Sequence, residues 1–396
     1  MTTSLDLPEP STVPLRSPHD VLAAIPYRLG FRPAESIVLA CTAERDRPGL
    51  VARVGIDDLR GDGAVEGLAA LARAVAETRP TYCALVLYTA RGVAAAADVL
   101  DEVHRALEPV VDVDGWLVTP DGYRGLGCED PTCCPEPGHP LAALDSGEIA
   151  AAYVLAGHVV ADSADAAYRI PRAPEQARNL VGRAARRSET ARERSQEGTE
   201  LGRWRDDALA AWREALRRVD VAPAAPGDDR ATTSLRPALI GRVAAALADR
   251  TVRDAALLTL VPGGEEAVRA TTQATDRAVV DDATSRVLGR VVDPTDAVAP
   301  DPDVLARARG VLEQVDAHVP RRLRAPALTF LAFLAWWAGD GPRASYRVAE
   351  ALDADETYRL ARLVHCVVAS ALPPGWIRAA SATTTGAGEC GAGGVR

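Results

Sequence analysis

Three of the seven cysteines lie in one short loop, which runs from Trp116 to His139 and is rich in Pro and Gly. Cys128, Cys133 and Cys134 form a C-x4-C-C-x4-H pattern together with His139. Cys, Cys, Cys and His are a complete ligand set for tetrahedral zinc. The spacing differs from a standard zinc motif, because paired ligands usually lie two to four residues apart and adjacent cysteines need an unusual backbone to face one ion.

The same side chains allow other chemistries besides metal binding. A disulfide between Cys133 and Cys134 is disfavoured, because neighbouring Cα atoms lie about 3.8 Å apart and an unstrained disulfide needs about 4.4 to 6.8 Å. Cys128 reaches either neighbour more easily, and a loop of buried, reduced thiols also fits. A nucleophilic cysteine comes last, because no Lys or Arg lies between Cys128 and His139 and the acidic residues raise a thiol pKa. A structural metal and a loop of reduced thiols are therefore the two leading interpretations, and our hypothesis is that Cys128, Cys133 and His139, with or without Cys134, hold one zinc ion.

Composition limits the class of protein. A chain of 396 residues predicts two to three domains. The net charge of −10 and the pI near 5.3 argue against a general nucleic-acid or anionic-membrane binder. The first residues lack the pattern of a signal peptide, and the longest apolar run, 325–338, is shorter than a spanning helix. With an odd number of cysteines, these features predict a cytoplasmic protein with no membrane segment and with thiols that are free or metal-bound.

The elements that must position the loop belong to an expected α/β domain over residues 17–160, preceded by a disordered arm at 1–16. Its first helix begins at Ser17, and Pro26 is expected to end or kink that helix early. Strands and helices then alternate, with strands at 36–41, 50–56, 82–88, 110–118 and 123–127 and helices at 65–78, 93–107 and 146–156. The cysteine loop therefore extends from the end of a hairpin, and loops at strand ends are where open α/β sheets carry function.

The rest of the chain is expected to be helical. Residues 161–234 read as a charged helical connector and linker, with 13 Arg and 8 acidic residues between Arg169 and Arg218. Such a segment suits an acidic partner or RNA, but a mixed-charge exposed helix is the simpler interpretation. Residues 235–375 read as an all-α domain with one tetratricopeptide-like helical hairpin around Trp336 and Trp337, and 376–396 as a disordered tail.

Several segments together resemble an actinobacterial family of uncharacterised cytoplasmic proteins, classed as a domain of unknown function. They are the Pro-Tyr-x-Leu-Gly-Phe motif at 26–31, the C-x4-C-C-P motif at 128–135 and the C-terminal segment with Trp336, Gly339 and Pro373-Pro374. The resemblance covers most of residues 18–374. After Arg53 this chain reads Val-Gly-Ile-Asp-Asp, where the family has an Asp-Leu-Pro-like segment. The family implies a fold and a source, and it brings no established activity.

Two classes of function fit these observations. A binding or adaptor protein that contacts a protein partner through the helical domain is favoured, because the sequence has no phosphate loop, no G-x-S-x-G and no H-E-x-x-H. The alternative is a small-molecule enzyme that uses the strand-end mouth of the α/β domain, with His19, Asp20, Arg32 and Arg53 as polar groups and the cysteine loop as lid. Simpler roles exist for each, since His19 and Asp20 suit a helix cap, Arg32 suits an exposed loop position, and Arg53 suits a pair with a neighbouring carboxylate.

Overall fold

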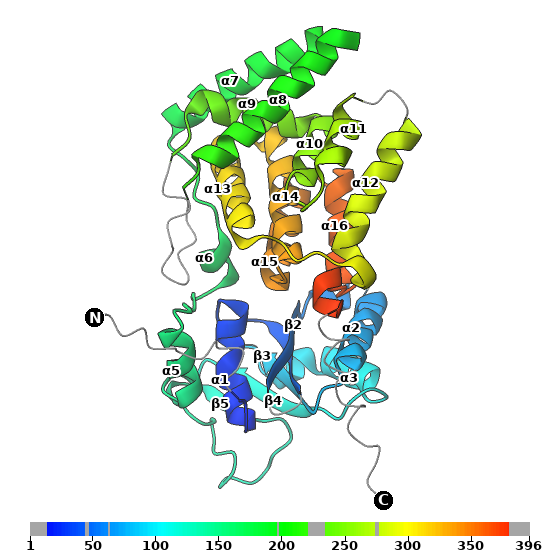
Figure 1. The fold of residues 1–396 in the computed structure, drawn as a ribbon. Helices are drawn as coiled ribbons and strands as arrows, with labels where there is room; N and C mark the ends of the chain where they lie inside the picture. The colour runs from blue at the N-terminus through cyan, green and yellow to red at the C-terminus, as the bar shows by residue number, and fades with distance from the viewer. Residues whose placement is uncertain are drawn as a thin grey trace, which may run out of the picture. The chain divides into compact units, whose positions relative to one another are not determined.

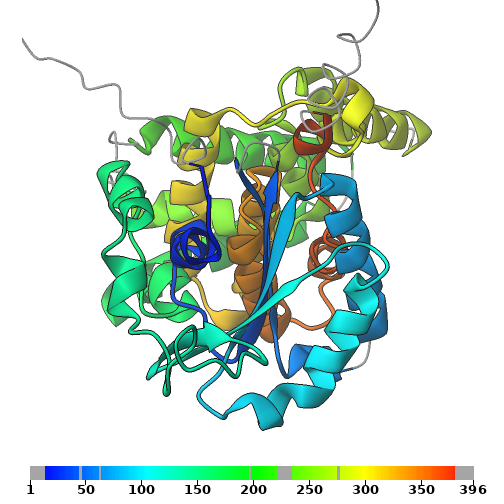
Figure 2. The same cartoon turned by 90° about the horizontal axis from the view of Figure 1, so that it is seen from below.

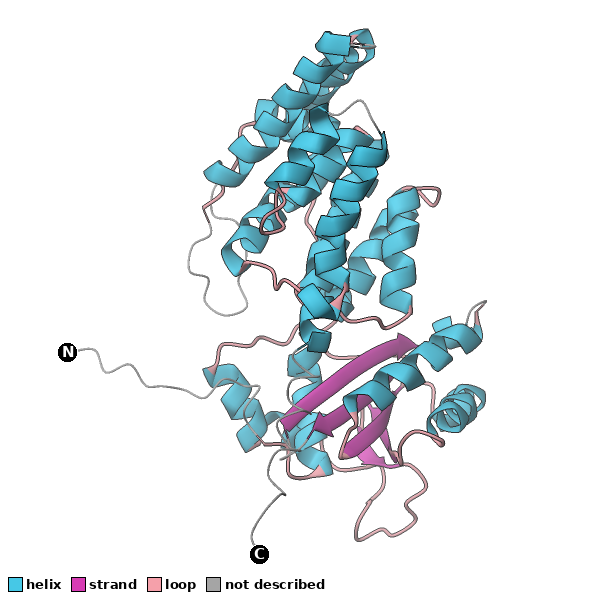
Figure 3. Ribbon diagram, turned by 45° about the vertical axis from the view of Figure 1, so that its right-hand side comes forward, coloured by secondary structure: helices cyan, strands magenta, loops and turns pink. Residues whose placement is uncertain are grey.

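The computed structural model describes residues 14–43, 47–61, 64–195, 198–220, 234–273 and 277–379. Contacts divide the chain into an α/β unit, which comprises the residues up to Arg169 together with 369–372, and a helical unit that begins at Ile170 (Figure 1). All the strands among the described residues lie in the first unit, as Figure 3 shows. The predicted α/β domain followed by an all-α region is therefore confirmed.

A five-stranded mixed sheet forms the centre of the α/β unit, in the order β2-β1-β3-β4-β5. β1 pairs antiparallel with β2, as the predicted hairpin requires, and antiparallel with β3. β3 and β4 are parallel, and β5 returns antiparallel to β4. The strands are β1 (Ser36–Ala43), β2 (Arg47–Gly55), β3 (Tyr82–Tyr88), β4 (Asp114–Thr119) and β5 (Gly122–Gly125).

Helices cover both faces of this sheet because its central strands are apolar on both sides. One face carries Ile37, Leu39 and Leu85, which belong to one buried cluster with residues of α2 (Ala64–Thr78) and α3 (Ala97–Leu107). The helix α1 (Pro18–Leu29) contacts β1 and β3 and packs against α4 (Ala142–Asp145) and α5 (Glu148–Leu155). Figure 2 shows α1 on one side of the sheet and α2 and α3 on the other.

Three local predictions in this unit need correction. α1 continues through Pro26 to Leu29, because Leu22, Ile25 and Leu29 are all buried on its packed face. The strand expected from residue 110 begins at Asp114, since Val110 and Val111 still donate their N–H groups to the Leu107 carbonyl at the end of α3. The helix expected at 146–156 is α5, which begins two residues later, at Glu148, and a separate short helix that was not expected, α4, precedes it.

Ten labelled helices of the helical unit surround one continuous apolar core, whose largest fully buried side chains include Trp212, Phe330 and Trp337. These helices are α7 (Glu175–Arg194), α8 (Gly198–Arg218), α9 (Pro237–Ala248), α10 (Arg250–Leu258), α11 (Glu265–Gln273), α12 (Arg277–Val292), α13 (Pro302–His318), α14 (Arg324–Trp337), α15 (Gly341–Ala354) and α16 (Arg359–Ala369). α14 and α15 pack on each other, and their tetratricopeptide-like character stays a prediction.

The boundaries of the helical unit differ from the expected ones. α7 and α8 lie in the segment 161–234, but they pack against α9 because Val181, Ala185 and Trp212 are buried in the common core. They are therefore part of the helical unit. At the other end, half-buried Trp376 donates to the Trp337 carbonyl at 2.8 Å, so packing extends beyond residue 375. The expected arm up to residue 13, the linker at 221–233 and the tail from 380 lie outside the described residues.

Among the described residues, no helix combines the length and the apolar character that crossing a bilayer requires.

Candidate thiol site

The cysteine loop is joined to the free edge of β5 at its far end. Tyr123 of β5 donates its N–H to the His139 carbonyl at 2.9 Å and accepts the His139 N–H at 2.8 Å. This pairing requires glycine on both sides, since a Cβ on Gly122 would lie 2.7 Å from the His139 carbonyl oxygen and one on Gly138 would lie 2.9 Å from the Tyr123 oxygen. Gly138 also has a φ of +145°. The two glycines thus fix where the loop ends.

A tight turn gives adjacent Cys133 and Cys134 the backbone that the sequence could not specify. The Asp130 carbonyl accepts the N–H of Cys133 at 3.1 Å and that of Cys134 at 2.7 Å. The Asp130 side chain accepts the N–H and the hydroxyl of Thr132 at 2.8 and 2.7 Å. Because Asp130 orders the turn through both its carbonyl and its carboxylate, the backbone that carries the two neighbouring cysteines is fixed.

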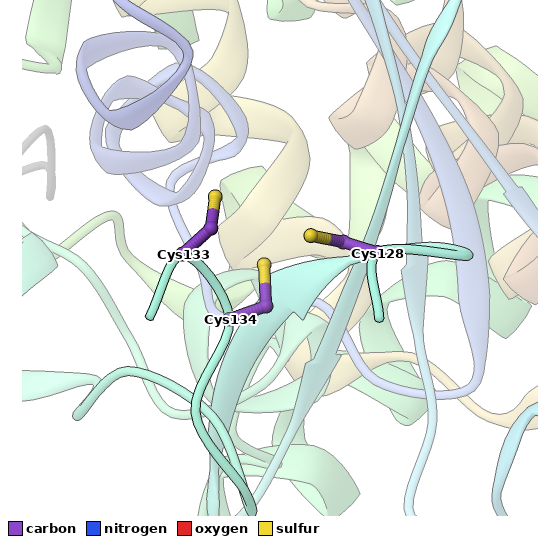
Figure 4. Close-up of side chains that lie close together, drawn as sticks. All are labelled: Cys128, Cys133 and Cys134. Atoms are coloured by element: carbon purple, nitrogen blue, oxygen red, sulfur yellow. The ribbon is translucent and has the colours of Figure 1, made fainter. Parts of the chain in front are cut away.

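The thiols of Cys128, Cys133 and Cys134, which we call the thiol cluster, lie within 4.8 Å of one another. Figure 4 shows the Cys128 side chain directed toward the other two sulfurs. Cys134 is buried, Cys128 is half-buried and Cys133 is exposed. The Gly125 N–H donates to the Cys134 sulfur at 3.3 Å, and the Asp130 N–H donates to Cys128, where it favours the thiolate.

Protonation within the thiol cluster is shared unequally. The N–H of Asp130, followed by the thiols of Cys134 and Cys133, holds the pKa of Cys128 below its usual value. The pKa of Cys133 is raised to about 11, first because it donates to the Cys128 sulfur. As expected, the charge of Asp130 raises the pKa of Cys128, but hydrogen bonds to the thiolate outweigh this charge and the net shift is downward. A cation among the three sulfurs would remove this competition for protons.

His139 does not join the thiol cluster. Its Nε2 lies 2.7 Å from the Cys133 carbonyl oxygen, and since a carbonyl only accepts, Nε2 carries the proton. The ring contacts Tyr123, with 5.2 Å between ring centres, and Tyr123 in turn contacts His19 at 6.0 Å. Among the described residues, the set of ligand atoms within 4.8 Å of one another contains three thiols and no imidazole.

The four polar residues expected to form a pocket make separate local contacts. Asp20 caps α1, accepting the N–H groups of Arg16 and Ser17 at 2.9 and 3.0 Å. Arg32 donates to both carboxylate oxygens of Asp145 at 3.0 Å. The Arg53 guanidinium lies 5.7 Å from the centre of the Phe31 ring, and His19 packs near Tyr123 as described above. The functional pocket stays a prediction, and among the simpler roles the structure shows the helix cap made by Asp20.

Glu35 is a polar residue that the sequence reasoning missed. It has a positive φ of 43° and precedes β1, and its carboxylate accepts the Ala90 N–H at 2.8 Å and the Arg91 Nε–H at 2.6 Å. It therefore lies at the carboxyl end of β3. The thiol cluster begins beyond Gly125, which is paired with Trp116 near the amino end of β4. The cluster and the strand-end mouth thus belong to different ends of the parallel pair. Neither a positive φ nor this pairing has a signal in the sequence pattern.

Two hollows lie within the helical unit. One, of about 310 Å³, is lined by residues of α7, α8 and α9 that include Trp204, Arg187 and Asp207. The other, of about 260 Å³, is lined by α13, α14 and α15 and includes Arg309 and Glu313. Each mixes basic and acidic side chains with apolar ones, so neither selects a class of ligand as clearly as three converging thiols do.

Comparison with known proteins gives a family and no function. The family described as "Domain of unknown function (DUF4192)" matches residues 18–375, which is most of the 396-residue chain. The chain therefore belongs to this family, in agreement with the predicted membership of an uncharacterised domain family. No curated protein and no solved structure matched the chain.

Proposed function

We propose that this member of the DUF4192 family is a zinc-binding protein, in which Cys128, Cys133 and Cys134 hold one Zn²⁺ in a mainly structural site. The observation that carries the proposal is the approach of three thiols to within 4.8 Å of one another. Zinc–sulfur bonds of about 2.3 Å place tetrahedral thiolates about 3.8 Å apart. A contraction of about 1 Å at the widest pair therefore brings all three sulfurs into ligand geometry.

The surroundings of the sulfurs support zinc over simple burial of reduced thiols. Main-chain N–H groups at Gly125 and Asp130 already donate to two of the sulfurs. Such donors stabilise thiolates, which are the form that binds metal. The ion would cross-link the end of β5 to the turn at Asp130, so its binding free energy would add to the stability of the loop.

The test is metal analysis of the full chain purified without a His tag. We expect about one equivalent of zinc, and we expect a Cys133→Ser variant to bind on the order of 100-fold more weakly, since even outer-shell changes weaken metal binding by 10- to 100-fold. Cys366→Ser is the matched control, because Cys366 is exposed on α16 in the helical unit. Chelation should lower the melting temperature of the α/β unit. Metal far below one equivalent in the native chain and in the Cys366→Ser control would refute the proposal.

The adaptor and enzyme hypotheses remain predictions beside this proposal. A stoichiometric protein partner copurified from the native host would support the adaptor role. A bound small molecule would support the enzyme. Neither outcome depends on whether the thiol cluster binds zinc.

A further inference from the structure

The geometry points to a coordination position on the zinc that the protein's own loop leaves open, and we propose that a neutral nitrogen donor from outside the loop, an imidazole or an amine, fills it. This inference rests on the proposed zinc site. It replaces the expected fourth ligand, His139, with an external one.

The loop supplies three ligands, and it holds the fourth candidate ligand, His139, away from the three sulfurs. His139 is held through its backbone by both hydrogen bonds to Tyr123 and through its ring by the Cys133 carbonyl. That ring bond uses Nε2, the ring centre lies 5.2 Å from that of Tyr123, and neither ring nitrogen belongs to the group of ligand atoms within 4.8 Å of one another. Tetrahedral zinc with three protein ligands keeps one position for water or another ligand.

One side of the proposed zinc site is accessible from solvent. Cys133 is exposed and Cys128 is half-buried, whereas Cys134 is buried against β5. An ion held by all three sulfurs therefore has the buried Cys134 on one side and the exposed Cys133 on the other. A ligand that approaches past Cys133 does not need to displace core side chains.

The charge around the ion would be negative. Zn²⁺ with three thiolates carries a net charge of −1, and Glu129, Asp130 and Glu136 of the loop are exposed carboxylates. The neighbouring cation Arg124 is paired with Glu136 at 3.2 Å. Because like charges repel, this environment disfavours an anionic ligand and favours an uncharged donor. Uncharged nitrogen donors are common ligands of zinc.

The experiment uses the full chain loaded with Co²⁺, whose visible absorption reports the number and type of its ligands. We expect stoichiometric Co²⁺ to give a thiolate-containing spectrum that imidazole changes saturably, with one imidazole bound per cobalt. Azide at the same ionic strength should need at least a 10-fold higher concentration. His139→Ala should show the same starting spectrum and the same response to imidazole. His139→Gln serves as a second variant if the alanine protein is unfolded by circular dichroism.

Three results separate the possible failures. A starting spectrum that changes in both His139 variants, together with no response of the native protein to imidazole, would make His139 the fourth ligand and overturn the inference. Azide binding more tightly than imidazole would overturn the class of donor. The absence of a stoichiometric cobalt–thiolate spectrum would instead refute the zinc site itself. A spectrum that depends on protein concentration, without imidazole, would support a donor supplied by a second copy of the chain.

Discussion

The α/β unit contains two groups of cysteines that lie in opposite environments. Cys41 and Cys83 face each other on the antiparallel strands β1 and β3, with their sulfurs 3.1 Å apart and exposures of 2% and 1%. The thiol cluster lies on a loop, with one sulfur exposed and two receiving main-chain N–H groups. Both groups bring thiols together, but the thiol cluster also offers main-chain N–H donors and an approach from solvent.

The difference shows that the surroundings of a thiol decide its chemistry. Cys41 and Cys83 are buried in the apolar core of the α/β unit with Ile37, Leu39 and Leu85. There the pKa of Cys41 is strongly raised, first by the hydrogen bond with the Cys83 thiol and then by burial, so the neutral thiol persists. In the thiol cluster the Asp130 N–H lowers the pKa of Cys128. Identical side chains thus form a buried, neutral pair in one place and the proposed metal ligands in the other.

The largest expected contrast is in thiol reactivity. In metal-free native protein, an aromatic disulfide reagent should modify the thiol cluster quickly, whereas Cys41 and Cys83 should react at least ~10³-fold more slowly, because their exposure requires opening of the sheet core. Mass spectrometry of peptides after timed quenching assigns each rate. Exposed Cys366 is the internal reference for an accessible thiol. Comparable rates for Cys83 and Cys366 would remove the distinction between the two groups.

A second prediction concerns the glycine that lets the loop dock on β5. Gly138→Ala places a Cβ 2.9 Å from the Tyr123 oxygen at a φ of +145°, so we expect a loss of about 1–3 kcal/mol and weaker zinc binding. Urea unfolding and metal titration measure the two effects. Gly127→Ala is the matched control, since Gly127 also has a positive φ, +76°, but no atom lies within 4 Å of its would-be Cβ. Equal zinc affinities in the two variants would contradict a role for loop docking.

Removing the Cys83 thiol, which faces Cys41, should lower the stability of the protein without changing its zinc content. Cys83→Ala leaves a small void beside Cys41 in the sheet core, and we expect a loss of about 1–2 kcal/mol in the free energy of unfolding. Zinc content should remain that of the native protein. Cys366→Ala, at an exposed position, should change stability by less than about 0.5 kcal/mol. A loss of zinc in Cys83→Ala would show that the two groups are coupled.

The smallest predicted effect is a dependence of stability on pH. The pKa of Cys41 is raised in the folded protein, so the folded state retains a proton that the unfolded chain releases above its ordinary value of about 8.5. The contribution of this retained proton to the free energy of unfolding is therefore complete below about pH 8.5. It falls as the pH rises, by at most about 1.4 kcal/mol per pH unit for one thiol. Urea unfolding between pH 7.5 and 9.5 should show this decrease in native protein and a smaller one in Cys41→Ala. Equal slopes would contradict it.

Local patterns in the sequence were sufficient for most of the fold. Ser17 and Asp20 predicted the start of α1, which has the full capping box. The β-branched and apolar runs predicted β1 and β3, because a buried central strand requires such side chains on both faces. The sequence also placed Cys128, Cys133 and Cys134 in one short loop, where their thiols lie within 4.8 Å of one another, and their role as metal ligands stays a prediction. These features depend on neighbours in the chain, so the sequence by itself carried the information.

Tertiary structure alone decided the features that depend on distant partners. Packing of α1 overrode the expected break at Pro26, and contact with α9 drew α7 and α8 into the helical unit. The register of β1 with β3 placed Cys41 opposite Cys83, which are 42 residues apart in the chain. Pairing with Tyr123 aimed His139 at a carbonyl instead of the sulfurs. A spacing specifies which groups can meet, whereas backbone hydrogen bonds between separate segments determine which of them do.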